Sequence, residues 1–226
     1  APRGSYLQGV ALANAADFYI HIGELEKAAG FFRQSISINK NDFHSISGLG
    51  TIAMKNDRNY GLASTLFNLV KSNYKLPDPL FKFYQLAQSR QDKRQEIWYA
   101  EQFAAAASLP VYGKMYTKYL VEIYTGILNK PELAEKVARE ELENRLTPQT
   151  AAWYSWALFS NKKPGQAEKI YKKYVSGKPL EGFELYYMGD LMAGLKKAYT
   201  AEEFYKAADK NKFDLSPAMI SKLDSR

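Results

Sequence analysis

An alanine recurs along the chain at intervals of 33 to 37 residues, and this repeat constrains the fold more than any other feature. The six alanines are Ala28, Ala63, Ala100, Ala134, Ala167 and Ala201. Four residues after each comes an aromatic residue or another alanine, and about twelve residues before each comes a mostly small residue. Two antiparallel helices approach closely only where both carry small side chains, and a ring one turn later fills the gap to the next hairpin. The pattern therefore predicts six similar helical hairpins stacked in sequence.

Helical periodicity runs the length of the chain, with apolar residues at the spacing of one helix face. One such stripe consists of Leu25, Ala28, Phe32 and Ile36. Short turn signals rich in Gly, Asn, Asp and Pro separate these segments. Asp78-Pro79 and Thr147-Pro148 each pair a capping side chain with a proline, which suits the first turn of a helix. No comparable alternation predicts strands, so we expect twelve helices in hairpin pairs and a short final helix from Ser216.

The register resembles that of the tetratricopeptide repeat family, whose unit is about 34 residues long. That family places a small residue late in the first helix, an alanine early in the second, an aromatic residue four positions on, and then another small residue. The sixth unit fills these places with Gly189, Ala201, Tyr205 and Ala208. The fourth and fifth units depart from the pattern, with Glu141 and Tyr174 at a site that is usually small. The resemblance spans nearly the whole chain.

This resemblance implies an all-α fold, a right-handed superhelical α-solenoid of about six helix-turn-helix repeats with a C-terminal capping helix. We expect a single solenoid domain over residues 1–226. The predicted repeats span about 9–42, 43–77, 78–110, 111–147, 148–181 and 182–215, and the cap spans 216–224. The first helix of each hairpin is expected to line the concave side.

Aromatic side chains suggest how such a solenoid would act, since the chain has 17 Tyr, 12 Phe and 3 Trp. Some of these rings belong to the repeat register, and the others fall on the inward faces of the first helices. Aromatic anchors with scattered polar groups suit a protein or peptide ligand. The predicted groove residues are Phe81, Tyr84, Lys118, Trp156, Phe159, Phe183, Tyr186 and Asp190. The alternative for each aromatic is burial between repeats, where large apolar side chains usually lie.

Catalysis and metal binding have few candidates in this sequence. There is no cysteine, which excludes disulfides, thiolate nucleophiles and thiolate metal sites. No Gly-rich phosphate loop and no nucleophile-elbow motif is present. Asp17, His21 and His44 are the candidates for a divalent metal site, and polar residues at a groove rim are the alternative. We therefore expect a non-enzymatic protein without a cofactor.

The formal net charge of +7 raises nucleic acid as a second class of partner, because aromatic platforms in a basic groove bind single strands. The charge is spread evenly, however. Residues 1–113 carry 12 basic and 9 acidic side chains, and residues 114–226 carry 19 and 15. Affinity for nucleic acid depends on clustered phosphate contacts. The distribution therefore favours a protein or peptide ligand.

The cellular context is less defined by the sequence. No apolar run approaches the roughly 20 residues that cross a bilayer. The segment from Trp153 to Ala208 resembles the last two repeats of many bacterial family members that are often exported, which favours the periplasm or cell surface over the cytoplasm. A further alternative is that these repeats are a module of a larger bacterial export or cell-surface protein, which the start at Ala1 rather than methionine fits. Partner identity and oligomeric state are left open.

Overall fold

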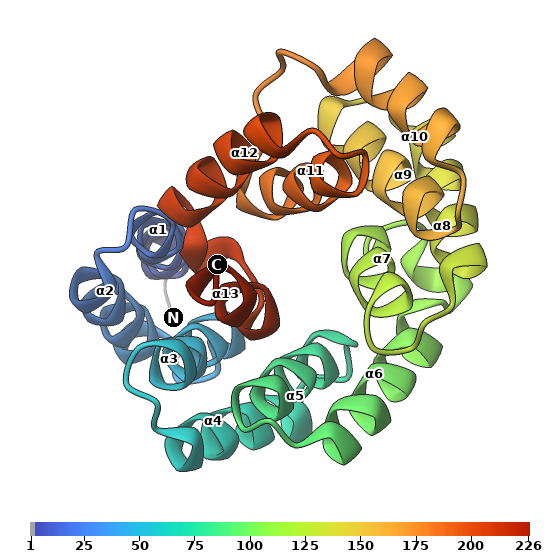
Figure 1. Ribbon diagram of the computed structural model, residues 1–226. Coiled ribbons are helices and arrows are strands. Elements are labelled where there is room, and N and C mark those ends of the chain that lie inside the picture. Colours follow the sequence, from blue (N-terminus) through green and yellow to red (C-terminus); the bar gives the residue numbers. More distant parts are fainter. Residues whose placement is uncertain (1–2) are drawn as a thin grey trace. The chain divides into compact units, whose positions relative to one another are not determined.

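The computed structural model describes residues 3–226, and this part of the chain contains thirteen α-helices and no β-strand (Figure 1). Twelve of the helices follow one another as pairs joined by short turns. The pairs are α1 (Arg3–His21) with α2 (Leu25–Ile38), α3 (Phe43–Lys55) with α4 (Tyr60–Asn73), α5 (Asp78–Ser89) with α6 (Lys93–Ala107), α7 (Thr117–Thr125) with α8 (Pro131–Asn144), α9 (Pro148–Ser160) with α10 (Pro164–Ile170), and α11 (Gly182–Gly194) with α12 (Ala198–Lys210). The last helix is α13 (Pro217–Asp224). The predicted all-α fold of consecutive helical hairpins is confirmed.

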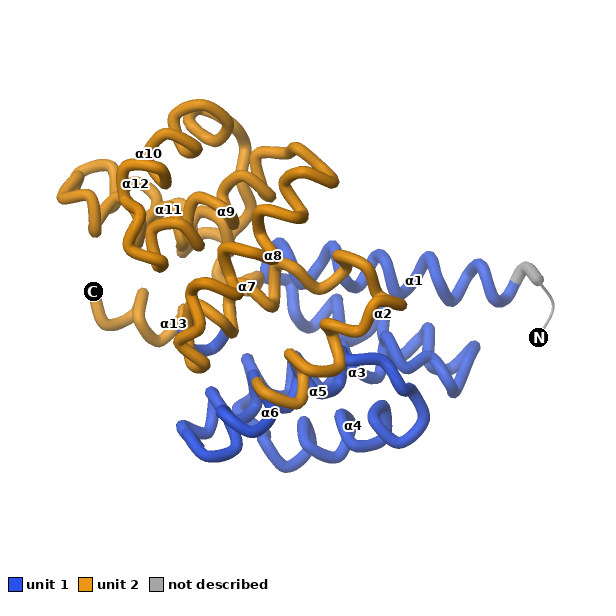
Figure 2. The backbone as a smooth tube through the Cα atoms, turned by 90° about the vertical axis from the view of Figure 1, so that its right-hand side faces the viewer, with its two compact units in different colours: residues 1–99, 216–218 blue, residues 100–215, 219–226 orange. Residues whose placement is uncertain are grey.

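Contacts divide the chain into two compact units (Figure 2). The first unit comprises residues 1–99 and 216–218, and the second comprises residues 100–215 and 219–226. Within the first unit, α1 packs on α2 and α3 packs on α4. Within the second, α8 packs on both α7 and α9, and α11 packs on both α9 and α12. These contacts join helices that are adjacent in sequence or, as with α9 and α11, the first helices of successive hairpins, as in other helical repeats.

The small positions of the repeat lie in the core of every hairpin. All six recurring alanines are at most 3% exposed. The residue opposite each of them is also buried: Ala16, Gly50, Ala87, Val121, Ser155 and Gly189. A Cβ atom on Gly50 would lie 2.5 Å from Cε1 of Phe67, and one on Gly189 would lie 2.5 Å from Cε1 of Tyr205. The ring of the second helix therefore packs directly over the glycine of the first.

Of the two predicted helix starts, the structure agrees with the one at Thr147 and differs at Asp78. The Thr147 hydroxyl accepts a hydrogen bond from the Thr150 amide at 3.2 Å and Pro148 begins α9, as the sequence predicts. Asp78, by contrast, is itself the first residue of α5, and the cap position before it is held by Pro77 without a side-chain hydrogen bond. Asp78 is therefore not a capping residue.

In the fifth hairpin, the second helix changes from α to π geometry over Tyr171–Val175. A π-turn contains one more residue than an α-turn. In the other hairpins, the residue seven positions after the alanine is at most 4% exposed: Ser35, Val70, Ala107, Glu141 and Ala208. Here Tyr174 has that spacing but is only half-buried, and the next residue, Val175, is 2% exposed. The extra residue lets the chain carry a tyrosine where the repeat usually has a small side chain.

The other departure from the repeat, Glu141, is buried with hydrogen-bond partners. Its side chain is 3% exposed and accepts hydrogen bonds from Arg145 Nε and Asn144 Nδ2, both at 3.1 Å. The Arg145 Nη2 atom lies 2.9 Å from the same carboxylate. A buried charge is tolerated only when it is paired and hydrogen-bonded. Asn144, the last residue of α8, and Arg145, the cap residue after it, supply both.

Candidate protein-binding surface

Trp156 is the centre of an aromatic stack in the second unit, formed by Trp156, Phe159 and Tyr187. The Trp156 and Phe159 rings, on successive turns of α9, lie 5.8 Å apart at 27°. Tyr187 of α11 stacks on Trp156 at 4.8 Å and 19°. The indole N–H of Trp156 donates to Oγ1 of Thr125 on α7 at 3.0 Å. Since Trp156 and Phe159 are only half-buried, the stack offers a fixed apolar surface to a ligand.

The position of the Phe159 ring depends on a glycine of the neighbouring helix α11. A Cβ atom on Gly194, at the end of α11, would overlap the Phe159 ring. The ring therefore occupies space that any other residue at position 194 would fill. Together with the hydrogen bond from Trp156, this contact fixes both rings of α9 before any ligand binds.

Lys118 of α7 lies close to two carboxylates, which balance its positive charge. Its Nζ atom is 3.7 Å from Oε1 of Glu184, 3.6 Å from Oε2 of Glu181 and 4.9 Å from the centre of the Phe183 ring. Glu184 is 1% exposed and accepts a hydrogen bond from the Trp153 indole at 2.6 Å. Burial raises the pKa of Glu184, and the charge of Lys118 opposes that rise. Burial alone would lower the pKa of Lys118, but the nearby carboxylates outweigh it and raise the pKa.

Asp190 of α11 is held by two residues of the same unit. Tyr205 donates to its Oδ1 atom at 2.7 Å, and Arg226 Nη2 lies 3.2 Å from the same oxygen. The Arg226 guanidinium also lies over the Tyr205 ring, 3.6 Å from its centre. Burial and the hydrogen bond to Asp190 both raise the pKa of Tyr205. A ligand cation at Asp190 would therefore have to displace Arg226.

The other four predicted groove residues lie in the core. Phe81, Tyr84, Phe183 and Tyr186 are at most 6% exposed, so their rings are not accessible to a ligand. Phe81 packs on Tyr84 with 5.5 Å between ring centres, and Phe183 packs edge-on against Tyr187 at 4.7 Å. Their assignment to the groove is therefore corrected to core packing. Phe81 and Tyr84 also belong to the first unit, whereas the remaining predicted residues belong to the second.

Two of the three candidate metal residues, His44 and Asp17, form a hydrogen bond instead of a metal cluster. Nε2 of His44, on α3, lies 2.8 Å from Oδ2 of Asp17, on α1. The hydrogen bond to Asp17 raises the pKa of His44, and burial opposes that rise. His21 does not complete a metal site, because no three His, Asp or Glu side chains within residues 3–226 are grouped to hold a metal ion. The contact links α1 to α3.

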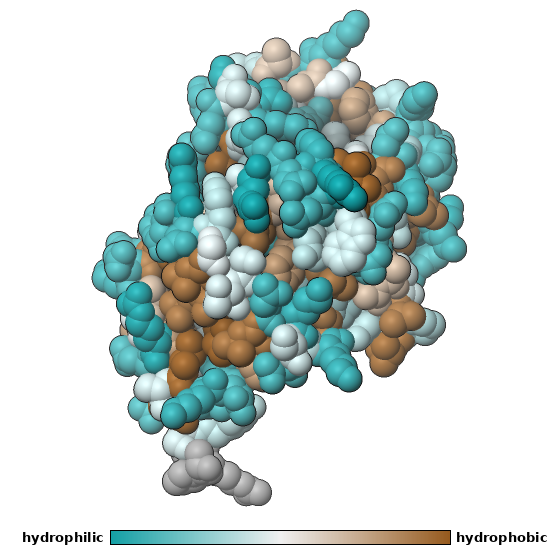
Figure 3. Space-filling view, turned by 90° about the horizontal axis from the view of Figure 1, so that it is seen from below, coloured by the Kyte–Doolittle hydropathy of each residue, from teal (hydrophilic) through white to brown (hydrophobic). Residues whose placement is uncertain are grey.

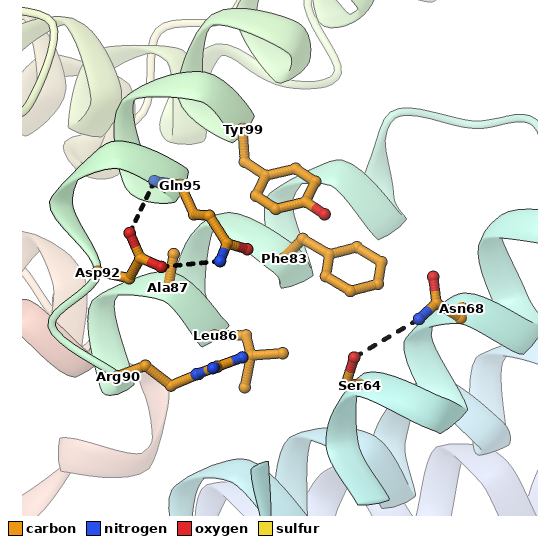
Figure 4. Close-up of a pocket in the computed structure, with 9 residues that line it drawn as sticks. All are labelled: Ser64, Asn68, Phe83, Leu86, Ala87, Arg90, Asp92, Gln95 and Tyr99. Atoms are coloured by element: carbon orange, nitrogen blue, oxygen red, sulfur yellow. Dashed lines mark hydrogen bonds between the residues drawn. The ribbon is translucent and has the colours of Figure 1, made fainter. Parts of the chain in front are cut away.

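A pocket of about 100 Å³ lies in the first unit, among α4, α5 and α6 (Figure 4). Its lining consists of Ser64, Asn68, Phe83, Leu86, Ala87, Arg90, Asp92, Gln95 and Tyr99. Tyr99 stacks on Phe83 at 5.0 Å, and Asp92 accepts hydrogen bonds from the backbone and side chain of Gln95 at 3.0 and 2.7 Å. Pockets for drug-sized ligands are roughly 300–1,000 Å³ and mostly apolar. This smaller, polar pocket is therefore a poor small-molecule site. The sequence pattern did not point to it, because its lining lies largely outside the first-helix faces.

These features define an α-helical repeat protein with a partly exposed aromatic stack on its first helices. No protein-family model matches the sequence, and no curated protein sequence matches it either. The chain is similar in fold to the solved structure of Pseudomonas aeruginosa pilF, with a TM-score of 0.55 and 14% sequence identity. The similarity covers 98% of this chain and 100% of that one. At this identity the likeness shows the fold alone. In the described part of the chain, no helix is long and apolar enough to cross a membrane.

Proposed function

We propose that this chain is a non-enzymatic tetratricopeptide-repeat scaffold that binds a protein or peptide ligand and acts as an assembly or adaptor module. The observation that carries the proposal is the stack of Trp156, Phe159 and Tyr187. Its outer rings, Trp156 and Phe159, are half-buried, and they are fixed by stacking and by the hydrogen bond to Thr125. Binding energy at interfaces concentrates in a few aromatic residues, and preorganised side chains lose little entropy on binding.

Lys118 and Asp190 are proposed to orient the ligand beside this stack. Both side chains are partly exposed and already paired with charges of the same unit. A ligand with charged side chains would exchange partners with these pairs, so the net gain in affinity would be small. Charge complementarity of this kind contributes more to specificity and association rate than to affinity.

The test uses a peptide ligand selected from a random library on the immobilised wild-type chain. Trp156→Ala with Phe159→Ala should weaken binding of that peptide at least about tenfold, the cost of a small hot spot. Tyr199→Ala is the matched control, since Tyr199 lies in the same unit and is 80% exposed. Circular dichroism and thermal unfolding establish that both variants are folded. Equal affinity of the folded double variant and the wild type would show that the ligand binds elsewhere.

The nucleic-acid alternative is less well supported by the charges of the second unit. Lys163 and Lys197 pair with Glu135 and Glu168 at 2.8 and 2.6 Å, and Lys114 pairs with Glu140. These ion pairs neutralise side chains that a phosphate backbone would need. The proposal that the repeats are a module of a larger bacterial export or cell-surface protein concerns cellular context and is compatible with the same binding surface.

A further inference from the structure

Arg226, which follows α13, occupies a small site formed by α11 and α12 in the second unit. Its Nη2 atom lies 3.2 Å from Oδ1 of Asp190, and its guanidinium carbon lies 3.6 Å from the centre of the Tyr205 ring. At that distance the guanidinium is in contact with the ring, as arginine side chains are when they stack on aromatic residues. Hydrophilic side chains reach the solvent over much of the face in Figure 3. Arg226 differs from a side chain that only points into water, because a carboxylate and a ring both contact it.

The two groups that contact Arg226 are fixed by the sixth hairpin itself. Tyr205 donates a hydrogen bond to Oδ1 of Asp190 at 2.7 Å, which orients the carboxylate. The Tyr205 ring packs against Gly189, where an added Cβ atom would lie 2.5 Å from Cε1 of the ring. Both contacts join α11 to α12, and neither involves Arg226. We therefore expect the site to keep its shape when Arg226 leaves it.

Arg226, by contrast, is held loosely. One of its nitrogens contacts one carboxylate oxygen at 3.2 Å, whereas strong arginine–carboxylate pairs use two parallel hydrogen bonds of roughly 2.7–2.9 Å. Its side chain is 43% exposed, and exposed ion pairs contribute little to stability. No residue from Ser221 to Arg226 is buried, and segments with few buried contacts open readily. Arg226 can therefore leave the site while the hairpin stays folded.

We propose that Asp190 and Tyr205 form a binding site for an arginine side chain of the ligand, and that Arg226 competes for this site from within the chain. The proposal rests on the peptide binding proposed above and specifies the chemistry of the ligand. A planar guanidinium can lie on the ring while its N–H groups reach the carboxylate. A lysine ammonium is a compact, strongly hydrated charge without a plane to stack, so the site prefers arginine. Since Arg226 must leave first, the apparent affinity for the ligand is the intrinsic affinity multiplied by the fraction of molecules with an open site.

Arg226→Ala empties the site, which can then be probed with N-acetyl-L-arginine amide in the absence of any peptide ligand. Amide chemical shifts of the isotopically labelled chain report binding at α11 and α12. The probe should bind Arg226→Ala with a dissociation constant in the millimolar range, and it should bind the wild type at least about fivefold more weakly. Lys222→Ala is the matched control, because it removes one positive charge from an exposed position of the same segment. This variant should bind the probe as weakly as the wild type does.

Two further titrations separate recognition of a guanidinium from attraction between opposite charges. N-acetyl-L-lysine amide should bind Arg226→Ala at least about threefold more weakly than the arginine probe does. Asp190→Asn, added to Arg226→Ala, should abolish measurable binding of the arginine probe, although the new amide oxygen still accepts the hydrogen bond from Tyr205. Thermal unfolding establishes that each variant is folded.

Three results would overturn the proposal. These are equal affinity of the wild type and Arg226→Ala for the arginine probe, equal affinity of Arg226→Ala for the two probes, and binding that is absent from α11–α12 or survives Asp190→Asn. The peptide assay with Trp156 and Phe159 uses other residues and another ligand. Failure of the arginine site is therefore distinguishable from failure of the proposed function.

Discussion

At the scale of single residues, the packing of two hairpins depends on a glycine whose missing side chain leaves room for a ring. Gly50 leaves room for Phe67 and Gly189 leaves room for Tyr205, and in both cases an added Cβ atom would lie 2.5 Å from the ring. Gly30 of α2 has no such role, since a Cβ atom there would meet nothing within 4 Å. Two glycines in the same unit therefore have opposite energetic roles.

Gly50→Ala should lower the free energy of unfolding by about 1–3 kcal/mol, because the methyl group overpacks the contact with Phe67. Gly30→Ala should raise it by about 0.5–1 kcal/mol, because alanine is the better helix former and finds open space. Urea denaturation of both variants measures the two changes. Equal effects of the two substitutions would mean that the Gly50–Phe67 contact is not tight in solution.

At the scale of elements, the π-turn in the fifth hairpin shifts the buried position by one residue. Val175 lies in the core and Tyr174 is half-buried, with the Lys173 ammonium 4.7 Å from the centre of its ring. In a regular α-helix with the register of the other hairpins, Tyr174 would take the buried place. The geometry of the second helix thus decides which of two adjacent side chains belongs to the core.

Val175→Asp should cost about 3 kcal/mol or more of stability, because it buries an unpaired carboxylate. Tyr174→Asp should cost about 1 kcal/mol or less, because the new side chain reaches water. Thermal and urea unfolding of the two variants compare them directly. The reverse order of destabilisation would indicate that the helix remains α-helical through Val175.

At the scale of the whole molecule, the free energy of unfolding of a helical repeat protein is close to a sum of two contributions. These are the intrinsic stabilities of the hairpins and the interactions between neighbouring hairpins. A defect in one hairpin should therefore spread to the hairpins it contacts and fade with distance along the chain. The division into two compact units strengthens this expectation, because Gly50 and α11–α12 belong to different units.

Hydrogen exchange of Gly50→Ala should show faster exchange in α3–α4 and in α2 and α5, which pack against them. Exchange in α11–α12 should match the wild type within about a factor of two, since this hairpin is expected to open independently of α3–α4. Mass spectrometry of peptides from each helix provides the measurement. A uniform acceleration in all helices would instead show that the chain unfolds as a single cooperative unit.

The sequence by itself determined the helical hairpins and their small positions. The recurring alanines and the residues opposite them are buried in every hairpin because that contact forms between helices adjacent in the chain, and it repeats six times. The pattern also pointed to Trp156 and Phe159. It could not show that the burial of Glu141 would be balanced by Arg145, or that a π-turn would exclude Tyr174 from the core.

Only the tertiary structure decided which rings are accessible. Phe183 and Trp156 were both predicted to line the groove, yet Phe183 is 2% exposed and Trp156 is half-buried. The same holds for α1, where Phe18 is 58% exposed at a position that is buried in α3, α7, α9 and α11. The periodicity of a helix specifies which side chains share a face. Whether that face meets water or another helix depends on which neighbour packs against it.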